Sequence, residues 1–375
     1  MNATNFRIPI PRSLSTLACV SLLALSSGTV SAQSGIVLSP QQDRNMPDAV
    51  LQFWTPERMK AARPMKLPQV EGPPAPAAPE TIKPSGKAGQ VKAVAPKGVK
   101  LDRKAPALQL SATPEVGPGS TVWYDYPPPQ NTFDLLGDSV RMQYPMSTFG
   151  KLYFQDAGGS GWVCSASSVT SAGDWGAGNR QMIVTAGHCC ADGAGNWHGN
   201  WLFVPAYWEG DQPFGSWAGA TAATFTAWFN DGDFSRDVCA IQLYNQNGVN
   251  IHDAVGALGY AWNWSLPRAY TVAGYPAADP FDGQRLLITT ASTAETDTLQ
   301  AGGAPFTQGL GTTMTGGSSG GPWVLGLNPG GGLGNWINGV NSYKYVGYPL
   351  EMFSPYFDDQ ILVLFESIAT LPPAP

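Results

Sequence analysis

The chain has 375 residues, of which 43% are hydrophobic and only 13% are charged, with 44 glycines and 33 prolines. So much glycine and proline argues against a helical bundle, because both residues disfavour helix interiors, whereas 13 Trp, 13 Tyr and 15 Phe favour β structure. Residues 33–130 hold twelve Lys and Arg against eight Asp and Glu, but residues 131–375 hold seven against nineteen. The acidic C-terminal part would repel phosphate, so we expect no nucleic-acid partner.

Residues 1–32 have the pattern of a secretory signal peptide. Arg7 and Arg12 precede a mostly apolar stretch from Leu14 to Leu25, and small residues follow up to Ala32, after which we expect cleavage. A membrane anchor is disfavoured because this run is shorter than the roughly 20 residues that a span needs. No later apolar run approaches that length. We therefore predict a secreted protein, either extracellular or retained in the periplasm or cell envelope, with no membrane span.

Residues 33–130 form a basic leader that does not resemble part of a packed core. Thr55 followed by Pro56 predicts the start of a short helix within Trp54–Ala62. From Pro64 to Pro106 the composition is mainly Pro, Ala, Lys, Gly and Val, and we expect this stretch to be extended and disordered. Two interpretations stay open, a removable propeptide that lies on the acidic domain and a solvated linker. The opposite charges of leader and domain favour the propeptide.

Residues 131–375 have the texture of an all-β domain, in which short apolar and aromatic runs alternate with Gly, Asn and Asp turns. The runs are Phe149–Phe154, Trp162–Val169, Gln181–Ala186, Trp201–Pro205, Val238–Leu243, Tyr270–Gly274, Leu286–Ile288 and Pro322–Leu325. One helix is expected at Pro355–Thr370, where apolar residues recur at steps of three and four.

Three segments of this domain contain residue types suited to nucleophilic catalysis. His188 follows an apolar strand that ends in small residues, and Asp237 directly precedes another apolar strand. Ser319 lies in the glycine-rich run Gly316–Pro322, where a tight turn can aim consecutive N–H groups at one point. A histidine base, a carboxylate that orients it and a serine nucleophile form a Ser-His-Asp triad.

The three motifs together resemble those of trypsin-like (chymotrypsin-fold) serine peptidases, closest to the bacterial glutamyl-endopeptidase branch. The matching segments are Thr185-Ala186-Gly187-His188-Cys189, Asp237-Val238-Cys239-Ala240 and Gly317-Ser318-Ser319-Gly320-Gly321-Pro322. The resemblance implies an all-β fold of two antiparallel six-stranded Greek-key barrels, at about 140–255 and 262–352, with a C-terminal α-helix at about 355–370.

The resemblance also assigns roles to individual residues. Ser319 would attack the scissile carbonyl as His188 takes its proton, Asp237 would orient His188, and the N–H groups of Gly317 and Ser319 would form the oxyanion hole. Ser318 is the alternative nucleophile. No cofactor or metal is expected, the substrates would be polypeptides, and the protein would be a monomer whose further partner is its own propeptide.

The cysteine count points to disulfides, since removal of Cys19 with the signal peptide leaves four cysteines, an even number in an exported protein. The family's histidine-loop disulfide corresponds to Cys164–Cys189. Cys190 and Cys239 are then left, either as a second disulfide or as two free buried thiols.

The chain departs from the family pattern at two places. Trypsin has Asp before the nucleophile, which pairs with a newly freed N-terminal amine; here Ser318 stands there, so maturation would work by removal of a covering segment. By analogy, the substrate pocket would be lined by Thr313, Met314, Asn341, Ser342 and Lys344. Asn341 stands where glutamyl endopeptidases have His, so a glutamate preference is not supported. Thr313 and the absence of an Asp at the base of the pocket argue against a strong Lys/Arg preference.

Two other functions remain as alternatives to a secreted serine endopeptidase. One is a secreted, catalytically silent trypsin-fold binding protein, although such proteins usually lose a triad residue and none is missing here. The other is an esterase that uses the same triad. Labelling with a fluorophosphonate, which reacts with an activated serine, separates an enzyme from a binding protein.

Overall fold

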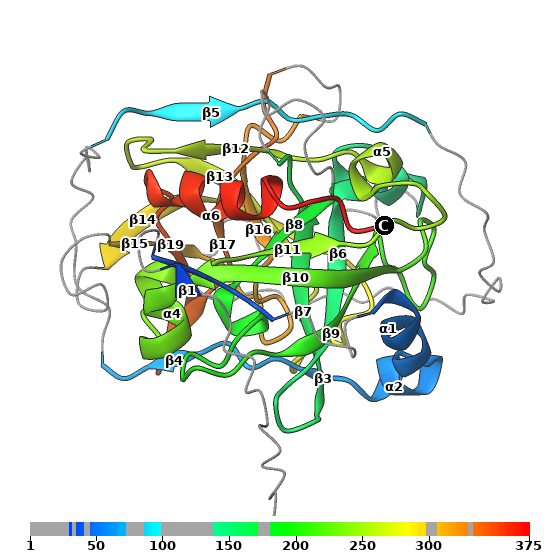
Figure 1. Ribbon diagram of the computed structural model, residues 1–375. Helices are drawn as coiled ribbons and strands as arrows, with labels where there is room; N and C mark the ends of the chain where they lie inside the picture. The colour runs from blue at the N-terminus through cyan, green and yellow to red at the C-terminus, as the bar shows by residue number, and fades with distance from the viewer. Residues whose placement is uncertain are drawn as a thin grey trace, which may run out of the picture.

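The computed structural model describes residues 30–31, 35–40, 46–72, 86–98, 138–171, 181–297, 306–328 and 333–375. Within these ranges the fold is all-β with a few short helices (Figure 1), which confirms the predicted class. Of the predicted signal peptide only Val30–Ser31 is described, so the expected cleavage after Ala32 lies outside these ranges. No helix in the described part is long and apolar enough to cross a membrane.

Six strands close into a barrel. They are β6 (Phe149–Gln155), β7 (Gly161–Ser168), β8 (Met182–Thr185), β9 (Gly199–Pro205), β10 (Trp217–Phe225) and β11 (Cys239–Leu243). The antiparallel order is β9-β6-β7-β8-β11-β10, and β10 pairs with β9 to close the ring. Large apolar side chains such as Leu152, Phe154 and Trp201 are fully buried in its interior. All six strands fall inside the predicted range 140–255.

A second sheet follows in the chain. It consists of β12 (Gly259–Trp262), β13 (Ala269–Gly274), β14 (Leu287–Asp297), β15 (Thr307–Gly311), β16 (Pro322–Leu325), β17 (Trp336–Val340), β18 (Tyr343–Tyr345) and β19 (Tyr348–Pro355). Its order is β18-β19-β15-β14-β13-β16-β17-β12. The described residues of this half form eight strands instead of the expected six, because the short β12 pairs in parallel with β17 at one edge and β18 pairs with β19 at the other.

The helices are short. Those described in the domain after the leader are α4 (Thr226–Asp231), α5 (Ile251–Val255) and α6 (Gln360–Ala369), with 3-10 turns η2 (Asp138–Met142), η3 (Met146–Thr148), η4 (Gly187–Cys189) and η5 (Phe234–Arg236). The predicted C-terminal helix is α6, which lies across β10 and β11 (Figure 1). Its buried residues Ile361, Leu364, Phe365 and Ile368 recur at the predicted steps. The helix begins five residues later than expected because Pro355 belongs to β19.

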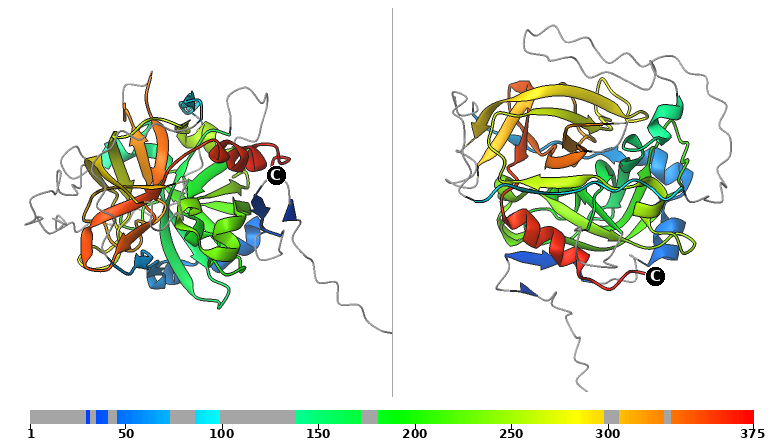
Figure 2. Two further views of the ribbon diagram at one scale, coloured as in Figure 1. Left: turned by 90° about the vertical axis from the view of Figure 1, so that its left-hand side faces the viewer. Right: turned by 90° about the horizontal axis from the view of Figure 1, so that it is seen from above.

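The leader is built into the fold over much of its described length. Its elements are β2 (Ile36–Leu38), α1 (Pro47–Phe53), α2 (Pro56–Ala61), β3 (Arg63–Pro64), β4 (Gln69–Val70) and β5 (Gly89–Val91). The short strand β1 (Val30–Ser31), which belongs to the predicted signal peptide, pairs with β2. These elements lie around the outside of the domain (Figures 1 and 2) and extend both sheets, since β2 pairs with β10, β3 with β7, β4 with β18 and β5 with β12.

The expectation that the leader lacks packed structure is therefore wrong for residues 64–72 and 86–98. The composition argument counted only the apolar surface that the leader can bury against itself. Leu67 and Val70 are instead buried in the same clusters as the domain side chains Met314 and Tyr343. Earlier in the leader, the indole N–H of Trp54 donates to the Asn200 carbonyl at 2.6 Å. The predicted helix start is confirmed, because the Thr55 hydroxyl accepts from the Arg58 N–H at the beginning of α2.

Candidate active site

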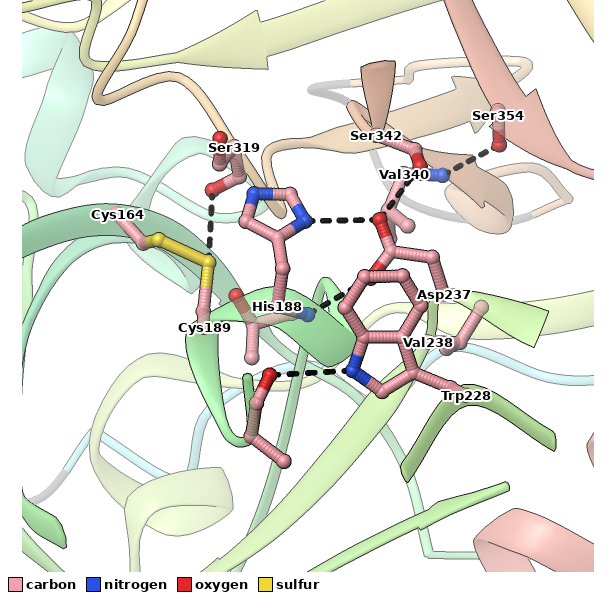
Figure 3. A network of polar contacts seen from close by, with 12 residues as sticks. Cys164, His188, Cys189, Trp228, Asp237, Val238, Ser319, Val340, Ser342 and Ser354 are labelled. Atoms are coloured by element: carbon pink, nitrogen blue, oxygen red, sulfur yellow. Dashed lines mark hydrogen bonds and ion pairs between the residues drawn. A yellow bond between two sulfur atoms is a disulfide. The ribbon is translucent and has the colours of Figure 1, made fainter. Parts of the chain in front are cut away.

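Two neighbouring barrel strands bring His188 and Asp237 together. His188 lies in η4 just after β8, Asp237 lies just before β11, and Thr185 and Cys239 are paired at the adjoining ends of these strands. His188 Nδ1 is 2.8 Å from Asp237 Oδ2, and the His188 backbone N–H donates to Asp237 Oδ1 at 2.7 Å (Figure 3). Both side chains are buried. The carboxylate therefore fixes the ring and its backbone at once.

Ser342, which is predicted from the sequence to line the substrate pocket, also contacts this carboxylate. Its hydroxyl donates to Asp237 Oδ2 at 2.5 Å. Ser342 directly precedes β18, so this contact joins the second sheet to the barrel. Asp237 is fully buried, and hydrogen bonds from a backbone N–H, an imidazole and a hydroxyl stabilise its charge there.

Ser319 lies in the loop between β15 and β16, on the side of the His188 ring opposite Asp237 (Figure 3). Ser319 Oγ and His188 Nε2 are both buried, and neither has a hydrogen-bond partner. Catalytic hydrogen bonds are often long without substrate and tighten during reaction. The alternative nucleophile Ser318 is occupied, because its hydroxyl donates to the Thr315 carbonyl at 2.7 Å.

The other two histidines are held by different contacts. His198 stacks on Phe154 with ring centroids 5.0 Å apart, and burial lowers the pKa of His198 to about 4. His252 Nε2 lies 3.3 Å from the Met182 carbonyl oxygen. His188 is thus the histidine that the fold places beside Ser319.

Two disulfides surround His188. The structure contains Cys164–Cys189 and Cys190–Cys239, so the two remaining cysteines are not free thiols. One bond ties Cys189, the residue after His188, to β7, and the other ties Cys190, which follows η4, to the start of β11. Among the described residues, the cluster Cys164, His188 and Cys189 contains metal-ligating atom types, but its two sulfur atoms are bonded to each other.

The turn before Ser319 has its carbonyl groups bonded to the surrounding protein. The Gly316 carbonyl accepts from the N–H groups of residues 277 and 278, at 2.7 and 3.0 Å. The Gly317 carbonyl accepts from the Ser165 hydroxyl at 3.0 Å, and the Ser165 hydroxyl accepts from the Tyr275 N–H at 2.8 Å. Gly317 has a φ of +93°, a conformation that favours glycine. These bonds leave the Gly317 N–H directed at the cleft.

We expect Ser165→Ala to lower kcat about tenfold with little change in KM. The change removes the hydroxyl that holds the Gly317 carbonyl and leaves the Tyr275 N–H without its acceptor, so the turn can rotate away from the geometry in which the predicted oxyanion hole would form. Complete loss of an oxyanion donor costs about 100- to 1,000-fold, and Ser165 acts on the donor indirectly. Steady-state kinetics on one peptide substrate measures the effect.

The control is Ser167→Ala on the same strand, because the Ser167 hydroxyl is buried without a hydrogen-bond partner. It should leave kcat unchanged. Equal losses in both variants would mean that Ser165 does not position the turn.

A cavity of about 1010 Å³ lies beside this turn. Of the residues predicted for the substrate pocket, Met314 and Lys344 line this cavity, whereas Thr313, Asn341 and Ser342 are not among its lining residues. The Asn341 side-chain amide donates to the Ser318 carbonyl and accepts from the Trp323 indole. The Lys344 ammonium donates to the carbonyls of residues 312 and 349. Both polar groups are therefore hydrogen-bonded within the domain. The cavity is also lined by leader residues 63, 64 and 66–69.

Comparison with solved structures identifies the class. Protease Anisep from Arthrobacter nicotinovorans is 35% identical to this chain, with a TM-score of 0.53; the match covers 60% of this chain and 96% of that one. The thermostable serine protease AL20 from an extremophilic microorganism is 37% identical, with a TM-score of 0.53, over 60% of this chain and 98% of that one. No protein-family model and no curated protein matches the chain. The chain belongs to the chymotrypsin-fold serine peptidases, and it is a serine-type peptidase.

Proposed function

We propose that this protein is a secreted serine endopeptidase that hydrolyses peptide bonds through an acyl-enzyme intermediate formed on Ser319. The observation that carries the proposal is the buried His188–Asp237 pair with Ser319 on the other face of the ring, in a chain whose relatives are serine proteases. Export is supported by the two disulfides, because such bonds persist in oxidising compartments.

In the proposed acylation step His188 Nε2 takes the Ser319 hydroxyl proton as Oγ attacks the scissile carbonyl. Asp237 holds the proton on Nδ1, so that Nε2 is free to act as base, and it stabilises the imidazolium that forms. The N–H groups of Gly317 and Ser319 bind the oxyanion, each donor contributing about 3 kcal/mol in comparable sites. His188 then protonates the leaving amine, and water repeats the sequence to release the acid.

The leader is proposed to be a propeptide that covers this site until it is removed. Charge supports this role, since the leader is basic and the domain acidic. Packing supports it too, because leader strands add to both sheets and residues 63–69 border the cavity beside the turn.

The test is fluorophosphonate labelling of a chain that begins after the leader, near residue 131. The relatives crystallised as proteins of about this domain's extent, since the match spans almost all of each. We expect stoichiometric labelling of the wild type and of Ser318→Ala, and none of Ser319→Ala. If labelling persists in Ser319→Ala and is lost in Ser318→Ala, the nucleophile is Ser318. No labelling of the wild type would favour a catalytically silent binding protein.

An esterase that uses the same triad would also be labelled. Hydrolysis of a peptide and of the matching ester distinguishes the two. An endopeptidase can protonate an amine leaving group, so it should hydrolyse both the peptide and the ester. Hydrolysis of the ester alone would contradict the endopeptidase assignment.

A further inference from the structure

The leader crosses the active-site cleft as an extended chain between residues 63 and 70. At one end β3 pairs in parallel with β7, and the Met65 N–H donates to the Val163 carbonyl at 2.9 Å. At the other end β4 pairs in parallel with β18, and the Lys344 N–H donates to the Pro68 carbonyl at 3.0 Å. The segment therefore joins the barrel to the second sheet on the cavity side of the turn.

The centre of this segment contacts the turn that precedes Ser319. The Gly317 N–H donates to the Met65 carbonyl oxygen at 2.9 Å, so a leader carbonyl takes the place in which an oxyanion would be bound. The fit is close, because a Cβ on Gly316 would lie 2.8 Å from the same oxygen. Ser319 and His188 are 0% and 3% exposed in this state. A substrate carbonyl cannot reach Gly317 while Met65 remains there.

Side chains of the segment also anchor it. Leu67 is buried in the same apolar cluster as Met314, which lines the cavity. The Arg63 guanidinium lies 4.2 Å from the centre of the Trp162 ring, a cation–π contact. Pro64 and Pro68 restrict the backbone to extended conformations, which reduces the entropy lost on binding.

The direction of the segment is opposite to that required of a substrate. The C-terminal half of a substrate carries the amine that His188 protonates, and His188 lies on the barrel in η4, so this half must lie on the barrel side. The N-terminal half carries the side chain for the pocket at Met314. In the leader, the N-terminal Arg63 lies on the barrel side and the C-terminal Val70 lies on β18 of the second sheet.

We propose that residues 63–70 are a reversed peptide ligand of this cleft, which inhibits the enzyme without being cleaved by it. In this orientation the Lys66 nitrogen, which would be the leaving group of the Met65–Lys66 bond, continues toward the second sheet and away from His188. Its departure would have no proton donor. The inference deepens the proposed function, on which it rests for the identity of His188 as that donor.

Direction of binding can be tested without catalysis. A synthetic peptide of residues 60–72 is added to the Ser319→Ala chain that begins near residue 131, with a photo-crosslinking group at position 62 or at position 71. We expect crosslinks near Trp162 from position 62 and near Gly347 from position 71. The opposite pattern, or no specific crosslink, would overturn the proposal. If the crosslinks follow the expected pattern but fluorophosphonate does not label the wild-type domain, only the proposed function is contradicted.

The full chain tests the inhibitory role. Leu67→Asp places a carboxylate in an apolar cluster without a partner, which weakens binding of the segment to the cleft. Hydrolysis of a small peptide substrate by the full chain should therefore rise at least tenfold, which corresponds to about 1.4 kcal/mol of lost binding free energy. The matched control is Leu51→Asp, the same substitution at an exposed leucine of the leader that lies outside residues 63–70; this variant should stay as inactive as the wild type.

Resistance to cleavage is read in the same assays. The unmodified peptide should inhibit the active domain competitively and remain intact by mass spectrometry after many turnovers of substrate. Rapid cleavage at Met65–Lys66 would show that this segment is not the inhibitory ligand. The same conclusion would follow if the full-chain Leu67→Asp variant stays inactive while the leaderless domain is active.

Discussion

Asp237→Asn should lower kcat about 10,000-fold while the fold is retained, the size of effect seen when a comparable triad holds the wrong tautomer. Asp237 Oδ1 accepts from the His188 backbone N–H, and this bond decides how the new amide is oriented. Its oxygen must face that N–H, so its NH₂ group faces His188 Nδ1. The imidazole must then accept at Nδ1 and carry its proton on Nε2, where it cannot act as a base.

Ser342→Ala is the control for this prediction. It removes one hydrogen bond to Asp237 Oδ2 but leaves both contacts to His188 intact. We expect kcat to fall far less than in Asp237→Asn, because the tautomer of His188 is unchanged. Kinetics of both variants, with near-UV circular dichroism as the check on folding, measure the difference. Comparable losses in the two would mean that Asp237 acts through packing and not through the tautomer.

The sequence was sufficient to predict the parts of the site that depend on local pattern. His188 and Asp237 stand beside apolar runs that became neighbouring strands, so their proximity follows from one strand pairing. The glycines around Ser319 predict the tight turn in which it lies. The contact between Ser342 and Asp237 depends on how the second sheet docks on the barrel, across 105 residues of chain, and no local pattern encodes it.

Elsewhere the sequence misled for a definable reason. Strand β10 is not among the predicted apolar runs. It contains several small Ala and Gly residues and lacks the alternation of apolar and polar residues on which strand prediction depends. Residues 64–72 of the leader lack the composition of a core, yet Leu67 and Val70 are buried because the domain provides the apolar surface. Composition measures what a segment can bury by itself, and it says nothing about a surface elsewhere in the chain.

Chains that begin at different positions between Gly119 and Asp138 should have the same kcat/KM within about twofold. In the trypsin pattern, an Asp before the nucleophile pairs with the new N-terminal amine. Ser318 takes that place here, and its hydroxyl is already bonded to the Thr315 carbonyl. Ser318 is fully buried, so an inserted amine would be a buried charge without a carboxylate beside it, which is costly. The turn is held by Ser165 and its neighbours whatever residue comes first.

Start positions beyond Arg141 provide the contrast. Arg141 is buried, and its guanidinium bonds to the Asp211 carboxylate and the Ala206 carbonyl. A chain that starts at Tyr144 loses these contacts and should melt at a lower temperature, for a reason unrelated to the identity of its first residue. Turnover on one peptide substrate and thermal midpoints, measured across the series, separate the two effects. Activity confined to a single start position between Gly119 and Asp138 would mean that the N-terminus inserts after all, and that Ser318 does not rule out an amine-dependent switch.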